Sequence, residues 1–204
     1  MKLPRLYAIV DAWCFAGDTR KMLAFGVALL AAGATLLQYR NKMGSSRQIL
    51  SEGRELKRKL GSQAQLIMND RADLCLGADF DGVHLGQDDI SIAGARQILG
   101  EARSIGLSTH NLQQFRDAAS TEADYIALGP IFATRSKQNP DAEVGLKTLT
   151  EARKLTSKPI VAIGGITRTN CRSVLDAGAD SVAVISDLLD TPDKSVEEFL
   201  RVLG

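Results

Sequence analysis

The chain has 204 residues, of which 45% are hydrophobic and 24% charged, values typical of a globular protein with a sizeable core. Its formal net charge is +1, and its lysines and arginines are scattered, which argues against a nucleic-acid-binding surface. The three cysteines are far apart and form no C-x-x-C pair, so neither a disulfide framework nor a zinc knuckle is expected.

The first residues lead directly into an apolar run and lack the apolar core of a signal peptide. The longest apolar-rich stretch, Phe25 to Leu37, contains two glycines and is too short to span a membrane. The three cysteines are expected to be reduced thiols, as in cytosolic proteins. We therefore expect a cytoplasmic protein that binds neither membrane nor nucleic acid.

Short apolar runs recur along the whole chain, and we expect each of them to be a β-strand. Their apolar residues are nearly continuous, as in strands that are buried on both faces of a parallel sheet. In chain order the runs are Leu6–Val10, Thr35–Tyr39, Gln65–Met68, Gly82–Leu85, Ser104–Leu107, Tyr125–Leu128, Ile160–Ile163 and Ser181–Ile185.

The segments between these runs carry apolar residues at three- and four-residue spacing, which is typical of helices. Asn111, and either Ser45 or Ser46, are candidate N-caps, while Gly33 and Gly178 stand where helices should end. The expected helices are Lys21–Ala32, Ser46–Leu60, Asp70–Ala78, Ile92–Leu99, Leu112–Ala119, Leu146–Leu155, Thr169–Ala177 and Val196–Leu203. Asp70–Ala78 shows the weakest helical pattern.

Strict alternation of strand and helix predicts a single (β/α)8 TIM barrel over residues 1–204. A doubly wound open sheet is the alternative. Such a sheet would be expected to carry a glycine-rich dinucleotide loop after its first strand. Here that position reads Val10-Asp11-Ala12-Trp13-Cys14, which contains no glycine.

Polar side chains follow most of the predicted strands, and in a barrel the carboxyl ends of all strands meet at one rim. Cations and hydroxyls dominate after the second, fifth and sixth strands. Together they resemble a cradle for a ligand with more than one phosphate. The set comprises Arg40, Lys42, Ser108, Thr134, Ser136 and Lys137.

Two carboxylates, Asp70 and Asp89, follow the neighbouring third and fourth strands. A pair of carboxylates that leaves room for phosphate oxygens and water suits Mg²⁺, a hard ion that keeps several non-protein ligands. The alternative is that Asp70 caps a helix and Asp89 pairs with a nearby arginine. The cations beside the pair favour the metal site.

Small residues follow the last two strands, namely Gly164, Gly165 and Ser186. Glycines at this place let backbone N–H groups approach a phosphate, so a monophosphate site is expected here. A plain tight turn is the alternative.

Two histidines and two aromatic residues stand near the predicted rim. His84 lies inside the fourth strand, where a hydrogen-bonded core histidine is the default interpretation. His110 could act as an acid or base at the rim or bond at a helix start. Trp13 and Phe15 could stack on a heterocycle or hold their own loop closed.

In order and spacing, six segments resemble the thiamine-phosphate synthase family over nearly the whole chain. They are Gln38-Tyr39-Arg40-Asn41-Lys42, Asn69-Asp70-Arg71-Ala72-Asp73, residues 82–89, Leu107-Ser108-Thr109-His110, residues 125–134 and Ala162-Ile163-Gly164-Gly165-Ile166. The resemblance implies an Mg²⁺-dependent transferase of thiamine biosynthesis. Its substrates would be hydroxymethylpyrimidine diphosphate and a thiazole (carboxy)phosphate, and its products thiamine phosphate and pyrophosphate.

The resemblance also implies a role for each matching residue. Gln38 would contact the pyrimidine, and Asp70 and Asp89 would ligate Mg²⁺. Residues that hold the diphosphate would be Arg40, Lys42, Asn69, Ser108 and Lys137, of which Arg40, Lys42, Ser108 and Lys137 would be catalytic. Residues that hold the thiazole phosphate would be Thr134, Ser136, Gly165, Ile185 and Ser186.

The reaction that the resemblance implies begins with loss of pyrophosphate from an electron-rich pyrimidine, so it needs leaving-group stabilisation more than a general base. The family's Thr-Pro-Thr-Lys loop reads Thr134-Arg135-Ser136-Lys137 here, which keeps the hydroxyl but loses the proline. A thiazole tautomerase on the same barrel and a non-catalytic phosphate-binding barrel are the competing hypotheses. Small-molecule substrates and a homo-oligomer are the expected partners.

Overall fold

The computed structural model describes residues 3–134 and 142–204. In these residues, eight parallel strands close into a barrel in which each strand pairs with the next along the chain and β8 pairs with β1. The strands are β1 Leu6–Asp11, β2 Leu36–Arg40, β3 Gln65–Asn69, β4 Gly82–Leu85, β5 Ser104–Thr109, β6 Tyr125–Leu128, β7 Ile160–Ile163 and β8 Ser181–Val184. The predicted barrel is confirmed, and the open sheet is wrong.

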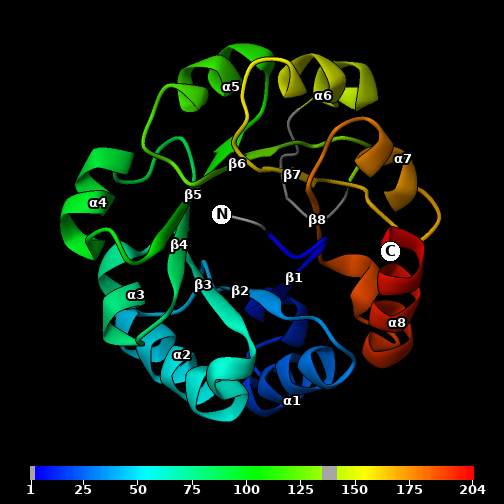
Figure 1. Ribbon diagram of the computed structural model, residues 1–204. Coiled ribbons are helices and arrows are strands. Elements are labelled where there is room, and N and C mark those ends of the chain that lie inside the picture. The colour runs from blue at the N-terminus through cyan, green and yellow to red at the C-terminus, as the bar shows by residue number, and fades with distance from the viewer. Residues whose placement is uncertain (1–2, 135–141) are drawn as a thin grey trace.

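Helices surround the barrel as an outer ring (Figure 1). The α-helices are α1 Thr19–Ala31, α2 Ser46–Leu60, α3 Ala72–Gly77, α4 Ile92–Leu99, α5 Leu112–Ala119, α6 Gly145–Arg153, α7 Cys171–Asp176 and α8 Pro192–Leu203. The described part of the chain also forms three short 3-10 helices, η1 Ala12–Phe15, η2 Gly61–Gln63 and η3 Ser186–Leu188. None of the described helices is long and apolar enough to cross a membrane.

Several predicted helix ends are confirmed by the side chains found there. Ser45 and Asn111 accept hydrogen bonds from the backbone N–H groups of Gln48 and Gln114, as N-caps do. Gly33 and Gly178 have φ angles of 104° and 113°, in the left-handed region that favours glycine.

The helix predicted to start at Asp70 is wrong in its first residues. Asp70 has a φ angle of 62°, which a right-handed helix excludes, and α3 starts at Ala72 with Arg71 before it. The backbone N–H of Asp70 instead bonds to the carbonyl of His84 on β4. Asp70 therefore stands on the rim of the barrel and does not cap a helix.

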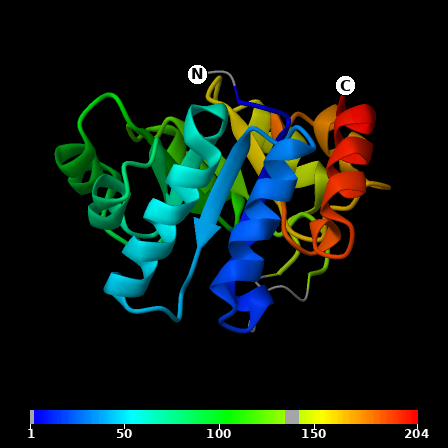
Figure 2. The ribbon, with the colours of Figure 1, turned by 90° about the horizontal axis from the view of Figure 1, so that it is seen from below.

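Within residues 3–134 and 142–204, two apolar clusters hold the fold together. The larger lies between the outer faces of the strands and the helices, which explains why the strands are apolar on consecutive residues. The smaller fills the barrel interior and includes Tyr7, Ile9, Tyr125, Val161 and Ala183. Both termini lie at one end of the barrel, and the arrowhead of β2 points to the other (Figure 2). The carboxyl ends of the strands, where the candidate site lies, are thus remote from the termini.

Candidate active site

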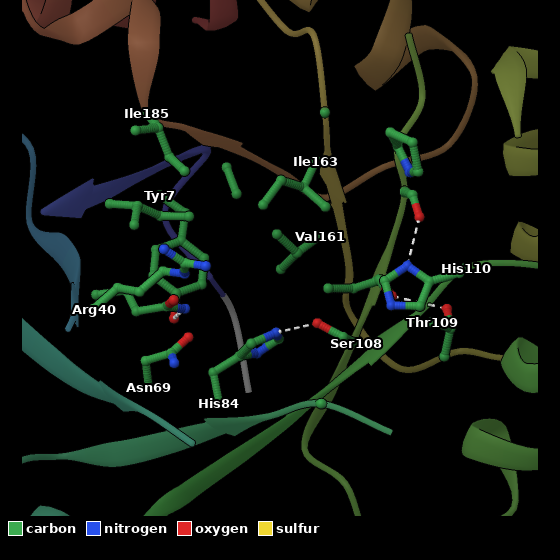
Figure 3. A pocket seen from close by; sticks show the side chains of 18 of the residues that line it. Tyr7, Arg40, Asn69, His84, Ser108, Thr109, His110, Val161, Ile163 and Ile185 are labelled. Carbon is green, nitrogen blue, oxygen red and sulfur yellow. Dashed lines mark hydrogen bonds between the residues drawn. The ribbon is translucent and has the colours of Figure 1, made fainter. Parts of the chain in front are cut away.

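A cavity of about 530 Å³ opens at the carboxyl ends of the strands (Figure 3). Every predicted site residue that the structure describes lines this cavity. They are Gln38, Arg40, Lys42, Asn69, Asp70, Asp89, Ser108, Thr134, Gly165, Ile185 and Ser186. Ser136 and Lys137, together with Arg135, lie outside the described residues.

The two described cations of the predicted cradle are each paired with a carboxylate. Arg40 donates to Oδ2 of the buried Asp11 at 2.5 Å, and Nζ of Lys42 lies 3.2 Å from Oδ2 of Asp70. Asp11 also accepts a hydrogen bond from the backbone of Trp13. Asp11 and Arg40 are direct partners in the register of β1 and β2, so the pairing fixes the guanidinium at the rim.

Asp70 and Asp89 stand beside one another at the ends of β3 and β4. Burial raises the pKa of the Asp70 carboxyl, the neighbouring Asp89 carboxylate adds to the rise, and Lys42 opposes it. Oδ2 of Asp89 accepts a hydrogen bond of 2.6 Å from the backbone N–H of Gly86, which fixes its orientation. The alternative interpretation needs an arginine that pairs with Asp89. Among the described ion pairs, Asp89 has no such partner.

The carboxylates of Asp70 and Asp89 fit a metal ion that takes its remaining ligands from a substrate and from water. Two carboxylates face each other here, and within the described residues no cluster contains three metal-ligating side chains. Mg²⁺ is commonly bound by one or two carboxylates, with phosphate oxygens and water completing its shell. Asp70 holds its place with a left-handed backbone, which aspartate tolerates better than most residues.

The glycines after β7 are tightly packed against the loop that follows β6. A Cβ on Gly164 would lie 2.4 Å from Cβ of Pro130, and one on Gly165 would lie 2.5 Å from the carbonyl oxygen of Ala133. Gly164 and Gly165 have φ angles of 100° and 63°. Ser186 starts η3 on the neighbouring strand end. Gly164 and Gly165 therefore leave no room for a side chain, and both line the cavity together with Ser186.

The two histidines have different surroundings. His84 is buried, and its Nδ1 and Nε2 lie 3.1 Å from the hydroxyl of Tyr125 and 2.8 Å from that of Ser108. The hydrogen-bonded core histidine is confirmed, although its bonds also reach the site. Nδ1 of His110 lies 2.9 Å from the carbonyl oxygen of Gly129 at the cavity rim.

The aromatic residues of the first loop do not line the cavity. Phe15 packs against Phe25 of α1 with ring centroids 5.2 Å apart, which supports its role in holding the loop closed. Trp13 is 66% exposed. The aromatic groups that do reach the cavity floor come from the strands, and Tyr7 is one of them.

Sequence reasoning missed several residues around the site. Asp11 stands in the segment after the first predicted strand without a predicted role, and no role is predicted for Tyr7 or Tyr125. Glu52 was also missed: its buried carboxylate accepts hydrogen bonds from Thr19, Tyr39, Asn41 and Gln48 behind β2. The only sequence signal for Glu52 is a charged residue on the apolar side of a helix.

Comparison with known proteins gives a consistent result. A family model described as thiamine monophosphate synthase matches residues 6–188. A thiamine-phosphate synthase of Koribacter versatilis is 59% identical over the whole chain and 97% of its own length. One of Chloroflexus aurantiacus is 43% identical over 93% of this chain and 87% of its own. The solved thiamine phosphate pyrophosphorylase from Pyrococcus furiosus superposes with a TM-score of 0.86 at 31% identity, covering 98% of this chain and 95% of its own.

Proposed function

The chain belongs to the thiamine monophosphate synthase family, and on that premise we propose that its cavity joins hydroxymethylpyrimidine diphosphate to a thiazole phosphate. The reaction transfers a pyrimidinylmethyl group to the thiazole nitrogen and gives thiamine phosphate and pyrophosphate. One carbon–oxygen bond breaks and one carbon–nitrogen bond forms.

The observation that carries the proposal is the presence of two different polar clusters in one cavity. Arg40, Lys42 and the paired aspartates lie at the ends of β2, β3 and β4, whereas Gly165 and Ser186 lie at the ends of β7 and β8. These strands occupy opposite sides of the barrel in Figure 1. One cluster suits a diphosphate and the other a monophosphate, as two phosphorylated substrates require.

Asp70 and Asp89 are the residues that would hold Mg²⁺. When bound, the ion would supply positive charge that offsets the charge of the diphosphate. Burial raises the pKa of the Asp70 carboxyl and the facing Asp89 carboxylate adds to the rise, which supports this assignment because a cation between the two carboxylates would offset both effects.

The protein's own groups act chiefly by binding and orienting. Arg40 and Lys42 bind the diphosphate and stabilise the negative charge that grows on it as the carbon–oxygen bond breaks. Asp11 keeps the Arg40 side chain in place before the substrate arrives. On the family resemblance, we assign Lys137 to the diphosphate site and Ser136 to the thiazole phosphate site.

Part of the cavity floor is apolar and is formed by Ile9, Ala127, Val161 and Ala183. Such a floor excludes water from a cation-like carbon, which water would otherwise trap as an alcohol. Positioning the thiazole nitrogen over that carbon then favours the productive bond. This division of labour needs no activated nucleophile from the protein.

A pair of matched variants tests the assignment of the two clusters. Arg40→Gln should raise KM for the pyrimidine diphosphate and lower kcat, with little change in KM for the thiazole phosphate. Ser186→Ala should raise KM for the thiazole phosphate by about tenfold, since a hydrogen bond to a charged group is worth about 1.5 kcal/mol. If both variants affect both substrates equally, the assignment of two separate subsites is wrong.

Three further expectations stay predictions. They are the cytoplasmic location, the organisation of residues 1–204 as one domain, and the homo-oligomer.

A further inference from the structure

A chain of hydrogen bonds crosses the barrel interior beneath the cavity. Nε2 of Gln38 lies 3.0 Å from the hydroxyl of Tyr7, which lies 3.0 Å from the hydroxyl of Tyr125. Tyr125 lies 3.1 Å from Nδ1 of His84, and Nε2 of His84 lies 2.8 Å from Oγ of Ser108. Figure 3 shows the last of these contacts. The chain thus joins a predicted pyrimidine contact to a predicted diphosphate contact.

The strand register builds this chain. His84, Gly106 and Tyr125 are direct partners across β4, β5 and β6. A Cβ on Gly106 would lie 2.1 Å from Cζ of Tyr125, so only glycine leaves room for the tyrosine ring. The ring stacks on His84 with centroids 5.5 Å apart and planes 18° apart. Both rings are therefore held in one orientation by packing.

The amide of Gln38 gives the chain its direction. An amide nitrogen only donates, so the Tyr7 oxygen accepts from Gln38, and the Tyr125 oxygen is then the remaining described partner for the Tyr7 proton. In a chain with this direction, Tyr125 accepts from Tyr7 and donates its own proton to Nδ1 of His84. Burial raises the pKa of both tyrosines, so both keep their protons at neutral pH.

The proton of the imidazole is fixed as a consequence. With Nδ1 accepting, a neutral His84 carries its proton on Nε2 and donates it to Oγ of Ser108. Ser108 then keeps its own proton for another acceptor. A doubly protonated ring would push the tyrosine protons back toward the Gln38 nitrogen, which cannot accept them.

We propose that Tyr7, Tyr125 and His84 are positioning residues, whose one-way chain of hydrogen bonds fixes the Gln38 amide and the Ser108 hydroxyl for the reaction. Gln38 is left with its Oε1 and one N–H for the pyrimidine, and Ser108 with a proton for the diphosphate. The opposite direction would turn the Ser108 proton toward His84 and present only lone pairs to the leaving group.

The benefit is electrostatic preorganisation. A donor already aimed at the leaving oxygens needs no rearrangement when charge develops there. A locked amide also offers a single donor–acceptor pattern to the pyrimidine, where a freely flipping one would offer two. The chain itself is a property of the free protein, whereas its role in catalysis rests on the proposed function.

Nitrogen NMR of the histidine-labelled wild-type protein tests the chain without any substrate. The protein has two histidines, so the signals that remain in the His110→Asn variant are those of His84. At neutral pH we expect a neutral His84 ring with a protonated Nε2 and an unprotonated Nδ1. A protonated Nδ1, or a charged ring, would overturn the proposed direction.

Kinetics of two variants test the positioning role. Tyr7→Phe and Tyr125→Phe each remove one hydroxyl, and each should raise KM for the pyrimidine diphosphate about tenfold and lower kcat. Tyr125→Phe should also give a mixture of His84 tautomers. The control is Ser181→Ala, which removes a buried hydroxyl of β8 whose Oγ has no hydrogen-bond partner in the described structure.

The outcomes separate this inference from the proposed function. Wild-type kinetics in both tyrosine variants, with thiamine phosphate still formed, would overturn the positioning role alone. Failure of the wild-type protein to form thiamine phosphate would overturn the proposed function and the positioning role together. An unaltered Ser181→Ala variant beside two impaired tyrosine variants supports the chain, and equal impairment of all three would contradict it.

Discussion

Replacing Asp89 with asparagine removes one unit of charge from the proposed metal site and little else. In the structure, Oδ2 of Asp89 accepts a hydrogen bond from the backbone of Gly86, and the asparagine oxygen can take over that bond. The loop after β4 should therefore keep its shape. What remains to hold Mg²⁺ is Asp70 alone, and a single carboxylate paired with Lys42 is a weak ligand set.

We expect Asp89→Asn to lower turnover by about 10²-fold at limiting Mg²⁺, which corresponds to about 2.7 kcal/mol of barrier. Charge grows on the departing diphosphate, so a cation held beside it stabilises the transition state more than the ground state. Excess Mg²⁺ should restore part of the rate. The assay is the initial rate of pyrophosphate formation over a series of Mg²⁺ concentrations.

Asp88→Asn is the matched control, because it removes the same charge from the adjacent residue, whose side chain is exposed. We expect it to reduce turnover by less than about tenfold. If Asp89→Asn retains wild-type turnover at limiting Mg²⁺, then Asp89 is not a ligand. A larger loss of turnover in Asp88→Asn than in Asp89→Asn would identify Asp88 as the ligand in its place.

Three other predictions follow from the packing and charges of the described residues. Gly165→Ala should raise KM for the thiazole phosphate about tenfold in steady-state assays, because its Cβ would lie 2.5 Å from a backbone oxygen; an unchanged KM would exclude the glycine from that subsite. Burial and a neighbouring carboxylate raise the pKa of Asp70, so the folded protein binds this proton more tightly than the unfolded chain does. The free energy of unfolding of the wild-type protein therefore falls as pH rises from the ordinary aspartate pKa to the raised value. Asp70→Asn should therefore raise Tm near pH 7 in Mg²⁺-free buffer and change it little near pH 3, and a lowered Tm near pH 7 would contradict this reasoning. Glu52→Ala should cost about 3 kcal/mol in urea unfolding, because Thr19, Tyr39 and Asn41 lose their shared acceptor, and a cost below about 1 kcal/mol would refute it.

The strands and most of the rim could be predicted from the sequence because a parallel barrel repeats one pattern. Each strand is covered by helices outside and side chains inside, so it is apolar throughout, and its polar residues collect where it ends. Arg40, Asp70 and Asp89 were predictable in this way without knowledge of their partners.

Features that depend on register and on interior geometry could not be predicted. Asp11 pairs with Arg40 because β1 and β2 align these two residues, and nothing local in either strand reveals the alignment. Tyr125 fits only because Gly106 of the neighbouring strand β5 lacks a side chain. The start of α3 was misplaced because the left-handed backbone of Asp70 follows from its place on the rim and not from helix propensity.

The most direct test of the proposed reaction is to measure pyrophosphate and thiamine phosphate together in one reaction with both substrates and Mg²⁺. We predict equal amounts of the two products, formed only when both substrates are present. Isomerisation of the thiazole without release of pyrophosphate would favour the tautomerase. Binding of either substrate with neither product formed would contradict the transferase and favour a non-catalytic barrel.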